Sequence, residues 1–433
     1  MQRKIQKRIR IRTIAVGLTA VMLSAMSHIT PSLAAPGDNA VVHWNEIALG
    51  IITSDSTRGT PSAASLYAAI TQLAVYDAVM AIAGTHEPYA FDGDAPGASI
   101  DAAVATAARD VLVHYFSSSS ASLDGETGAY TSALAAIPAG PAKDDGIAVG
   151  HSAAQAIIAA RANDGRNTAV AEPPNGTEPG VWRRTGTNPS ALAVTPYVGQ
   201  VTPFLVDSAD EFRPKGPNRL DSHAYAVEFE RTRLYGAKTG SMRDEEQTEI
   251  ALFWTENTLR QYNRALRALA TERALSVVDS ARLFAMTDVP AADAMITCWN
   301  TKYHYLAWRP VTAINAADTD GNPLTTKPEQ TWEPLSPTGL HPEYTSGHAC
   351  LTGAITRGLR EFLGTKDINF AMTYIGPFTG IEPRFFATID DLRTEVEDAR
   401  VYGGDHWTSG GVDGTILGDD LAKKALHDYF EEI

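Results

Sequence analysis

Cysteine and positive charge are both scarce in this sequence of 433 residues. It has two cysteines, and its 36 basic residues stand against 51 acidic ones, for a formal net charge of −15 at pH 7. An acidic surface repels nucleic acid and anionic lipid at long range, so we expect no nucleic-acid partner. The apolar and charged fractions, 44% and 20%, are ordinary for a folded globular protein and exclude a disordered chain.

Long hydrophobic runs are absent after the first 35 residues, so we expect no membrane span in the mature chain. Before that point, six basic residues are followed by an apolar run at 14–26 and by small residues at 31–35. This order predicts a signal peptide at 1–34, cut after Ala34 or Ala35, because the apolar run is too short for a comfortable membrane anchor. We therefore expect an exported protein, either periplasmic or secreted.

Loss of the signal peptide would make the charge balance still more negative. Without its six basic residues the chain has 30 basic against 51 acidic residues, a formal net charge of −21. Any site for an anion must then be a local concentration of cations that acts against the field of the whole protein.

Strand periodicity is missing from the first third of the chain, where apolar residues recur at helical spacing. We predict an all-α fold of two packed helical bundles within a single domain, 35–433. The N-terminal bundle covers about 40–163, with helices at 41–53, 62–83, 102–115, 122–136 and 144–162. The C-terminal bundle covers about 222–433, with helices at 222–234, 243–254, 259–286, 291–308, 346–363, 389–402 and 414–430.

A proline-rich stretch at 165–220 separates the two bundles, and its eight prolines exclude regular helix. So long a connection is uncommon within a compact domain unless it is functional. We interpret it as an ordered excursion packed over the helical core rather than a flexible linker. The apolar anchors that favour this interpretation are Trp182, Leu192, Tyr197, Phe204 and Phe212.

The stretch 332–350, WEPLSPTGLHPEYTSGHAC, is the most informative part of the sequence. A loop broken by proline and glycine ends at Ser346, after which apolar residues recur at helical spacing. Ser346 is therefore predicted to be a helix N-cap, and Gly347 would leave a bare backbone N–H at the helix mouth. Unpaired N–H groups and the positive end of the helix dipole favour an anion there, beside His348.

Two further motifs lie on either side of this helix mouth. Lys302 and Arg309 are two helical turns apart and would share a face, with Arg309 near the helix end because Pro310 follows it. Arg400 and His406 are six residues apart, and the intervening Gly403-Gly404 would end a helix and let His406 fold back. Taken singly, the first pair is more typical of a solvated face, and the second of a helix end followed by a buried histidine.

Together the three motifs favour a pocket for one tetrahedral oxyanion. His348 and His406 would lie on opposite sides of it, where one imidazole could bond the central atom while the other moves protons. The groups that suit the oxygens are three cations, a hydroxyl and a backbone N–H, from Lys302, Arg309, Arg400, Ser346 and Gly347.

The pattern Lys-x6-Arg-Pro, Ser-Gly-His and Arg-x5-His, between Lys302 and His406, resembles that of the vanadium-dependent haloperoxidases and the related type-2 phosphatidic acid phosphatases. Its three parts occur in the family's order and with the family's internal spacing. One departure is Thr345, where the family often has proline. We expect this change to alter the rigidity of the loop more than the anion contacts.

The resemblance implies vanadate as cofactor, with His406 as the axial ligand of vanadium and His348 as the acid–base residue. It implies that hydrogen peroxide, polarised by Lys302, oxidises halide to hypohalous acid, while vanadium acts as a Lewis acid and stays oxidised. A small organic acceptor is a further expected partner. The residues implied to hold the vanadate oxygens are Lys302, Arg309, Ser346, Gly347 and Arg400.

Two residues favour the haloperoxidase branch of the superfamily. His341 lies where haloperoxidases border the metal site, and Trp299 lies one helical turn before Lys302. These features resemble exported bacterial haloperoxidases, including iodide-oxidising ones, so we expect iodide or bromide rather than chloride.

Two alternatives remain at this point. The first is an exported phosphatase of the same superfamily, in which His406 forms a phosphohistidine and His348 protonates the leaving alcohol. The second is a non-catalytic anion-binding helical protein, which leaves two histidines without a role.

The two cysteines, Cys298 and Cys350, each lie beside one of the motifs that are expected to meet. A disulfide is permitted in an exported protein. We favour such a bond slightly over its alternative, two buried free thiols.

Overall fold

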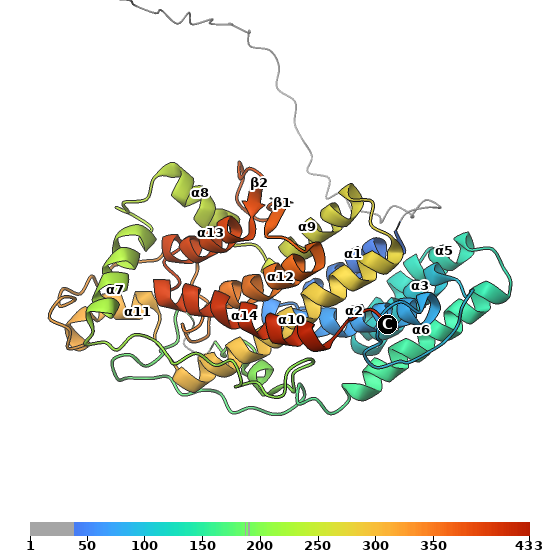
Figure 1. Ribbon diagram of the computed structural model, residues 1–433. Coiled ribbons are helices and arrows are strands. Elements are labelled where there is room, and N and C mark those ends of the chain that lie inside the picture. The colour runs from blue at the N-terminus through green and yellow to red at the C-terminus, as the bar shows by residue number, and fades with distance from the viewer. Residues whose placement is uncertain (1–38, 187, 189–190) are drawn as a thin grey trace, which may run out of the picture. The chain divides into compact units, whose positions relative to one another are not determined.

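Helices make up most of the described residues, which are 39–186, 188 and 191–433 of the computed structural model (Figure 1). The predicted all-α fold class is confirmed, whereas the predicted signal peptide at 1–34 lies outside the described residues. The first group of helices comprises α1 (Ala40–Ser54), α2 (Pro61–Ala83), α3 (Ile100–Tyr115), α4 (Ser120–Asp124), α5 (Ala129–Ala136) and α6 (Pro141–Ala160). The second comprises α7 (His223–Gly236), α8 (Glu245–Phe253), α9 (Thr258–Glu272), α10 (Val277–Tyr305), α11 (Pro310–Asn315), α12 (Gly347–Leu363), α13 (Ile389–Tyr402) and α14 (Thr408–Asp428).

Helix α2 is apolar on every face, so it is stable only where neighbours cover it on all sides. Helices α1, α3, α6 and α10 pack around it, and it is buried from Ser62 to Ala81. By length and composition it is the one helix among the described residues that could cross a membrane, but 89% of its apolar stretch is buried inside the protein. Its surroundings are those of the central helix of a bundle.

A single helix, α10, joins the two groups, where we predicted a break at Pro290. Proline has no N–H, so the carbonyl of Met286, one turn earlier, lacks its helical donor. Gly358 of α12 packs directly against that carbonyl, since an added Cβ would lie 2.1 Å from the Met286 oxygen. The predicted break was therefore wrong, because dense packing around the proline keeps α10 continuous.

Two other helix predictions were wrong at their boundaries. The expected helix 259–286 is divided between α9 and α10, because Ser276 caps α10 by accepting a hydrogen bond from the N–H of Asp279 at 3.0 Å. The expected helix 122–136 is divided between α4 and α5 at Gly125 and Gly128, residues that weaken a helix.

A short antiparallel hairpin replaces the irregular piece that we expected after α12. It comprises β1 (Asp367–Met372) and β2 (Arg384–Thr388), with Phe370 opposite Phe386. Alternate residues of β1 are buried, which is the pattern of a strand with one face on a core. The same alternation is present in the sequence but covers only six residues, so the nearby prolines obscured it.

Glycines bring α14 against α12 and start it earlier than predicted. A Cβ at Gly414 would lie 3.0 Å from the Cβ of Ala349, and one at Gly418 would lie 2.1 Å from the carbonyl oxygen of Cys350. The glycine-rich start of α14 is thus a packing surface rather than a loop, and the helix begins at Thr408 instead of near 414. This contact holds the segment before α14 close to the first turn of α12 (Figure 1).

The proline-rich excursion is packed on the helical core as predicted, and its regular structure among the described residues is one 3₁₀ turn, η2 (Pro196–Gln200). Trp182 and Phe204 are buried, whereas Leu192 is 71% exposed and was wrongly predicted as an anchor. Backbone hydrogen bonds fix the excursion to the end of α10: Trp182 donates to the carbonyl of Leu306 at 2.6 Å, and Trp308 donates to that of Gly180 at 2.9 Å.

A second, smaller core lies beside α7 and contains residues adjacent to two of the motifs. Trp407 stacks on Phe229 with ring centroids 5.9 Å apart, and Trp308 and Trp332 are buried in the same cluster. Because Trp308 precedes Arg309 and Trp407 follows His406, this aromatic cluster fixes the backbone on which both side chains are mounted.

The excursion should lose stability when its main anchor on α10 is removed. The carboxylate of Asp293 is fully buried and accepts hydrogen bonds from the N–H groups of Phe204 and Leu205 at 2.6 and 2.7 Å. Asp293→Ala leaves both donors buried without an acceptor, so we expect it to lower the free energy of unfolding by about 2 kcal/mol in urea titration. Asp420→Ala, on the exposed face of α14, is the matched control and should change it by less than about 0.5 kcal/mol. Equal effects of the two substitutions would contradict this account.

Candidate active site

The three motifs meet around one cavity of about 440 Å³. Its walls come from α10, the loop that precedes α12, the first turns of α12, the end of α13 with the turn that follows it, and the excursion. The start of α2, the turn between α8 and α9, and the loop between β1 and β2 complete them. Six of the eight predicted site residues line it: Arg309, His341, Gly347, His348, Arg400 and His406. Lys302 and Ser346 do not. Much of the remaining lining is apolar, including Trp299, Met295, Leu351, Val194 and Phe378.

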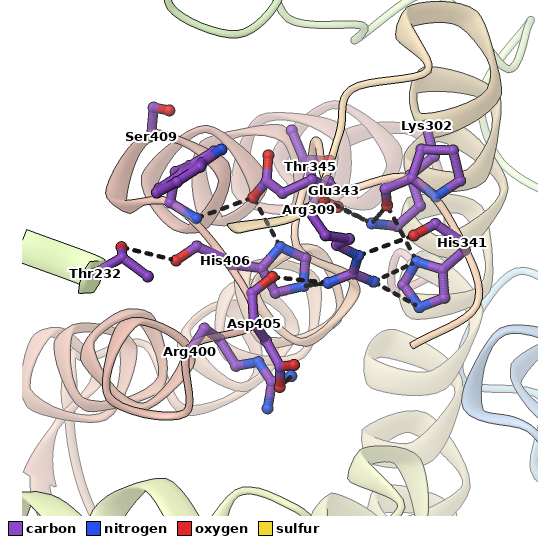
Figure 2. Close-up of polar contacts among 12 residues, drawn as sticks. Thr232, Lys302, Arg309, His341, Glu343, Thr345, Arg400, Asp405, His406 and Ser409 are labelled. Carbon is purple, nitrogen blue, oxygen red and sulfur yellow. Dashed lines mark hydrogen bonds and ion pairs between the residues drawn. The ribbon is translucent and has the colours of Figure 1, made fainter. Parts of the chain in front are cut away.

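His406 lies at the base of this cavity and is 2% exposed. Its Nδ1 is 2.8 Å from the Oε1 atom of Glu343, and its Nε2 is 3.1 Å from an N–H of Arg309 (Figure 2). Burial lowers the pKa of His406 well below its ordinary value, and the charge of Arg309 acts in the same direction. The imidazole is therefore neutral near pH 7. As predicted, the chain turns back here, since Asp405 and His406 both donate backbone hydrogen bonds to the carbonyl of Arg400.

Arg309 is the most connected cation of the site (Figure 2). Its Nε donates to the carbonyl of His341 at 2.9 Å, and its Nη1 to the carbonyl of Asp405 at 2.8 Å. Burial lowers its pKa to about 10, which still leaves the guanidinium charged at neutral pH. We predicted that Arg309 shares a helical face with Lys302, and this was wrong. Helix α10 ends at Tyr305, and Arg309 is an extended N-cap residue before Pro310.

Arg400 is the second arginine of the cavity and lies in the last turn of α13. It pairs with Asp405, whose Oδ2 is 2.6 Å from Arg400 Nη2. The Nε of Arg400 and the Oδ1 of Asp405 are buried and have no hydrogen-bond partner among the described residues. Burial raises the pKa of Asp405, and the charge of Arg400 opposes this rise. Asp405 thus pairs with an arginine rather than orienting an imidazole.

The mouth of α12 carries two polar groups that protein atoms leave unsatisfied. Ser346 is the N-cap residue, as predicted, but its hydroxyl makes no capping bond, and its Oγ is buried without a partner among the described residues. The Nε2 of His348 is buried and unpartnered in the same way. Burial lowers the pKa of His348 well below its ordinary value, with Arg400 adding to the effect. A Cβ at Gly347 would lie 3.0 Å from the ring of Trp299, so this position has room only for a bare backbone.

Lys302 lies behind the loop rather than in the cavity. Its fully buried ammonium group donates to the carbonyls of Pro342 and Glu343, each at 3.0 Å, and to that of Thr345. Burial lowers its pKa to about 8. The protons of this ammonium group hold the backbone that leads to Ser346, and its charge contributes to the site from outside the cavity wall.

His341 lies over the opposite edge of the Arg309 guanidinium. Its Nδ1 and Nε2 are 3.0 and 3.3 Å from Arg309 Nη2, and its ring centroid is 5.1 Å from that of Trp299. Trp299 is fixed in turn by the excursion, because its Nε1 donates to the carbonyl of Val194 at 3.1 Å. The excursion therefore supplies part of the cavity wall next to His341.

Glu343 is the residue of this site that our sequence analysis missed. It is fully buried, and its Oε1 accepts from both His406 Nδ1 and the backbone N–H of Trp407, at 2.8 and 3.1 Å. Burial raises its pKa, whereas the charges of Lys302 and Arg309 oppose this rise and favour the ionised carboxylate. The sequence did contain a signal for it, because Glu343 is an acidic residue five positions before His348 in the stretch 332–350.

The cysteines are free thiols, so the disulfide that we favoured is absent from the structure. Cys298 and Cys350 are both buried, and their sulfurs lie 3.3 and 3.2 Å from the same atom, Thr345 Oγ1. The two motifs do meet beside these cysteines, as the prediction required. The hydroxyl of Thr345 forms the contact with each sulfur in place of a covalent bond.

The fold and the cavity together define a mainly helical protein with a pocket that two arginines and three histidines line. Residues 282–432 match the family model of the VCPO second helical-bundle domain. The chain is also similar to vanadium chloroperoxidase of Curvularia inaequalis, at 26% identity over 200 residues, and to vanadium-dependent bromoperoxidase of Ascophyllum nodosum, at 32% over 127 residues. These matches cover 39% and 27% of the chain, and about a third and a fifth of the two relatives (32% and 22%).

Solved structures show the same fold over most of the chain. A bacterial vanadium-dependent iodoperoxidase matches with a TM-score of 0.74 at 22% identity, over 91% of this chain and 96% of that one. A holo-type bacterial vanadium-dependent chloroperoxidase matches with a TM-score of 0.70 at 18% identity, over 90% and 97% of the two chains. The chain is thus similar to the vanadium-dependent haloperoxidases in its C-terminal bundle and shares their fold, and the resemblance predicted from its three motifs is confirmed.

His348 should remain neutral across the physiological pH range. Because its pKa is lowered by burial and by Arg400, we expect its imidazole nitrogens to show no titration between pH 6 and 8 in ¹H–¹⁵N spectra of histidine-labelled protein. His427 is the internal comparison, since it is exposed and Asp428 raises its pKa, so it should titrate in or just above this range. The signal of His348 is assigned by its loss in His348→Gln. A midpoint for His348 above pH 6.5 would contradict the assignment of burial as the dominant cause.

Proposed function

We propose that this protein is an exported, vanadate-dependent haloperoxidase that oxidises iodide or bromide with hydrogen peroxide to hypohalous acid. One observation carries the proposal: His406 has its Nδ1 bonded to Glu343 and its Nε2 beside Arg309 at the base of a cavity that His348 and Arg400 also line. That arrangement offers one nitrogen ligand together with donors for several oxygens. The family resemblance supports vanadate as the oxyanion, and the basic, then apolar start of the chain supports export.

The residues at the cavity fit a tetrahedral oxyanion. Ser346 Oγ, His348 Nε2 and Arg400 Nε are buried polar atoms without partners among the described residues, and such atoms are unfavourable unless a ligand or water satisfies them. Gly347 presents a bare backbone at the helix mouth, where an added Cβ would lie 3.0 Å from the ring of Trp299. We therefore propose that Arg309, Arg400, Ser346 and Gly347 hold the oxygens, and that His406 Nε2 holds the vanadium. Lys302 would contribute its charge from behind the loop.

When bound, vanadate would supply a Lewis acid that activates hydrogen peroxide without itself being reduced. The protein's part is to bind, orient and move protons. Arg309 and Arg400, both buried, would balance the negative charge of the oxyanion. His348, being neutral, can accept a proton from hydrogen peroxide at its unpartnered Nε2 and return it to the departing water.

The halide would approach from the side formed by Trp299 and His341. Both rings border the cavity next to Arg309, whose charge attracts an anion. A large, polarisable halide suits such an aromatic wall better than a strongly hydrated one, which supports iodide or bromide over chloride. The apolar remainder of the cavity has room for a small organic acceptor beyond the halide.

An activity assay of protein reconstituted with vanadate distinguishes the haloperoxidase function from the phosphatase function. Purified protein loaded with orthovanadate should oxidise iodide and bromide in the presence of peroxide, and His406→Ala should abolish this activity because the metal ligand is lost. His304→Ala, an exposed histidine on α10, is the matched control and should retain full activity. A parallel assay follows hydrolysis of a chromogenic phosphate ester without vanadate. Robust phosphate release together with no halide oxidation would replace the proposed function by the phosphatase alternative.

Replacement of His341 should affect halide use more than cofactor binding. His341→Ala removes the ring but keeps the backbone carbonyl that accepts from Arg309 Nε, so the guanidinium stays in place. We expect the KM for iodide to rise about tenfold, equivalent to about 1.4 kcal/mol, with less than about a threefold change in vanadate affinity. Steady-state kinetics and vanadate titration measure the two effects. Unchanged halide kinetics would remove His341 from the halide side of the site.

A further inference from the structure

The orientation of His406 depends on one buried carboxylate. Glu343 is 0% exposed, and its Oε1 lies within hydrogen-bonding distance of two N–H groups, those of His406 Nδ1 and of the Trp407 backbone. A backbone amide can only donate, so Oε1 must act as an acceptor. An ionised carboxylate, the form that Lys302 and Arg309 favour, can only accept, so the 2.8 Å contact requires Nδ1 of His406 to carry the proton.

A second contact leads to the same tautomer from the other side of the ring. Arginine has donors and no acceptor, so the 3.1 Å contact between Arg309 Nη1 and His406 Nε2 requires a bare lone pair on Nε2. The longer contact to Arg309 thus favours the same neutral form of the imidazole that the shorter contact to Glu343 selects. It is the form that can donate its Nε2 lone pair to a central atom.

We propose that Glu343 is the positioning residue of this site, which fixes His406 with Nδ1 protonated and Nε2 turned towards the cavity. A carboxylate bonded to the far nitrogen of a ligating histidine holds the ring orientation and increases its basicity. The inference rests on the proposed function only in giving His406 the role of ligand. The tautomer itself is a property of the protein alone.

The surrounding chain is built to hold this carboxylate in place. The backbone N–H of Glu343 donates to the carbonyl of Ala307 at 2.9 Å, and Lys302 donates to the carbonyl of Glu343 at 3.0 Å. Space for the carboxylate comes from Gly410 of α14, where an added Cβ would lie 2.3 Å from Oε1. Lys302 and Gly410 therefore act on His406 through Glu343, although neither touches the ring.

The matched control is a second buried glutamate, Glu228 of α7, whose side chain contacts the start of α14. Glu228 is 5% exposed, and its Oε2 accepts from the backbone N–H of Ser409 at 3.1 Å, much as Glu343 accepts from Trp407. Its other oxygen contacts Asn218 rather than an imidazole. Removal of Glu228 therefore tests the loss of a buried carboxylate at α14 without the contact to His406.

The experiment uses cofactor-free protein labelled with ¹⁵N-histidine, and long-range ¹H–¹⁵N spectra identify which nitrogen of His406 is protonated. The His406 signals are assigned by their loss in His406→Gln. We expect Nδ1–H with bare Nε2 in the wild type and in Glu343→Gln, because Trp407 N–H keeps the amide oxygen at the position of Oε1. Glu343→Leu should lose this single pattern, because the ring is then held only by the 3.1 Å contact to Arg309 Nη1, which also donates to the carbonyl of Asp405. Glu228→Leu should keep it.

Orthovanadate affinity is measured on the same proteins by calorimetric titration. We expect binding about 10- to 100-fold weaker in Glu343→Leu, an intermediate loss in Glu343→Gln, and little change in Glu228→Leu. A wild-type His406 protonated on Nε2, or an unchanged tautomer in Glu343→Leu, would overturn the proposal. Should Glu343→Leu fail to fold, Gly410→Ala takes its place, since its added Cβ would lie 2.3 Å from Oε1 and displace the carboxylate without removing it. Loss of the single Nδ1–H pattern in this variant is expected, and an unchanged pattern would overturn the proposal. Because the spectra need no cofactor, absent halide oxidation would count against the proposed function and not against Glu343.

Discussion

Burial of the Arg309 guanidinium is the interaction on which the rest of the site depends. One planar group connects the loop before α12 with the turn after α13, through the carbonyls of His341 and Asp405 and the Nε2 of His406. A guanidinium this deep is unfavourable unless its donors are paired, so the segments that pair with it cannot move independently. The aromatic cluster around Trp308 and Trp407 then fixes the same two segments from outside.

Charge balance explains why such a pocket persists in an acidic protein. Three buried cations, Lys302, Arg309 and Arg400, are accompanied by two buried carboxylates, Glu343 and Asp405. Most acidic residues elsewhere among the described residues lie at the surface and are screened by water, whereas these five groups interact across a medium of low polarity. The pocket is therefore short of negative charge, and a bound oxyanion would complete it. The two carboxylates keep the cations from repelling one another in its absence.

Local sequence signals predicted the parts of the site whose geometry is local. Ser346 as the N-cap of α12, the helix end at Gly403-Gly404 and the return of His406 each follow from a few neighbouring residues. The fold class followed equally from helical periodicity over long stretches.

Features that depend on distant partners could not be predicted in the same way. Pro290 lies within α10 because Gly358 and other distant residues pack around it, and Lys302 faces backbone carbonyls some forty residues further along the chain. The role of Glu343 could be recognised only from the structure, which places Gly410 and His406 beside its carboxylate. In each case a tertiary contact either overrode the local sequence pattern or supplied information that the pattern does not contain.

The continuity of α10 also limits how the molecule can be divided. The matched bundle domain begins at residue 282, five residues into α10, yet the same helix packs against α2 of the first group. A fragment that starts at the domain boundary would expose the face of α10 that α2 normally covers, and it would lose the excursion that holds Trp299. Gene truncation or exchange of this bundle between relatives would therefore yield an aggregation-prone piece unless the helices that cover α10 are carried with it.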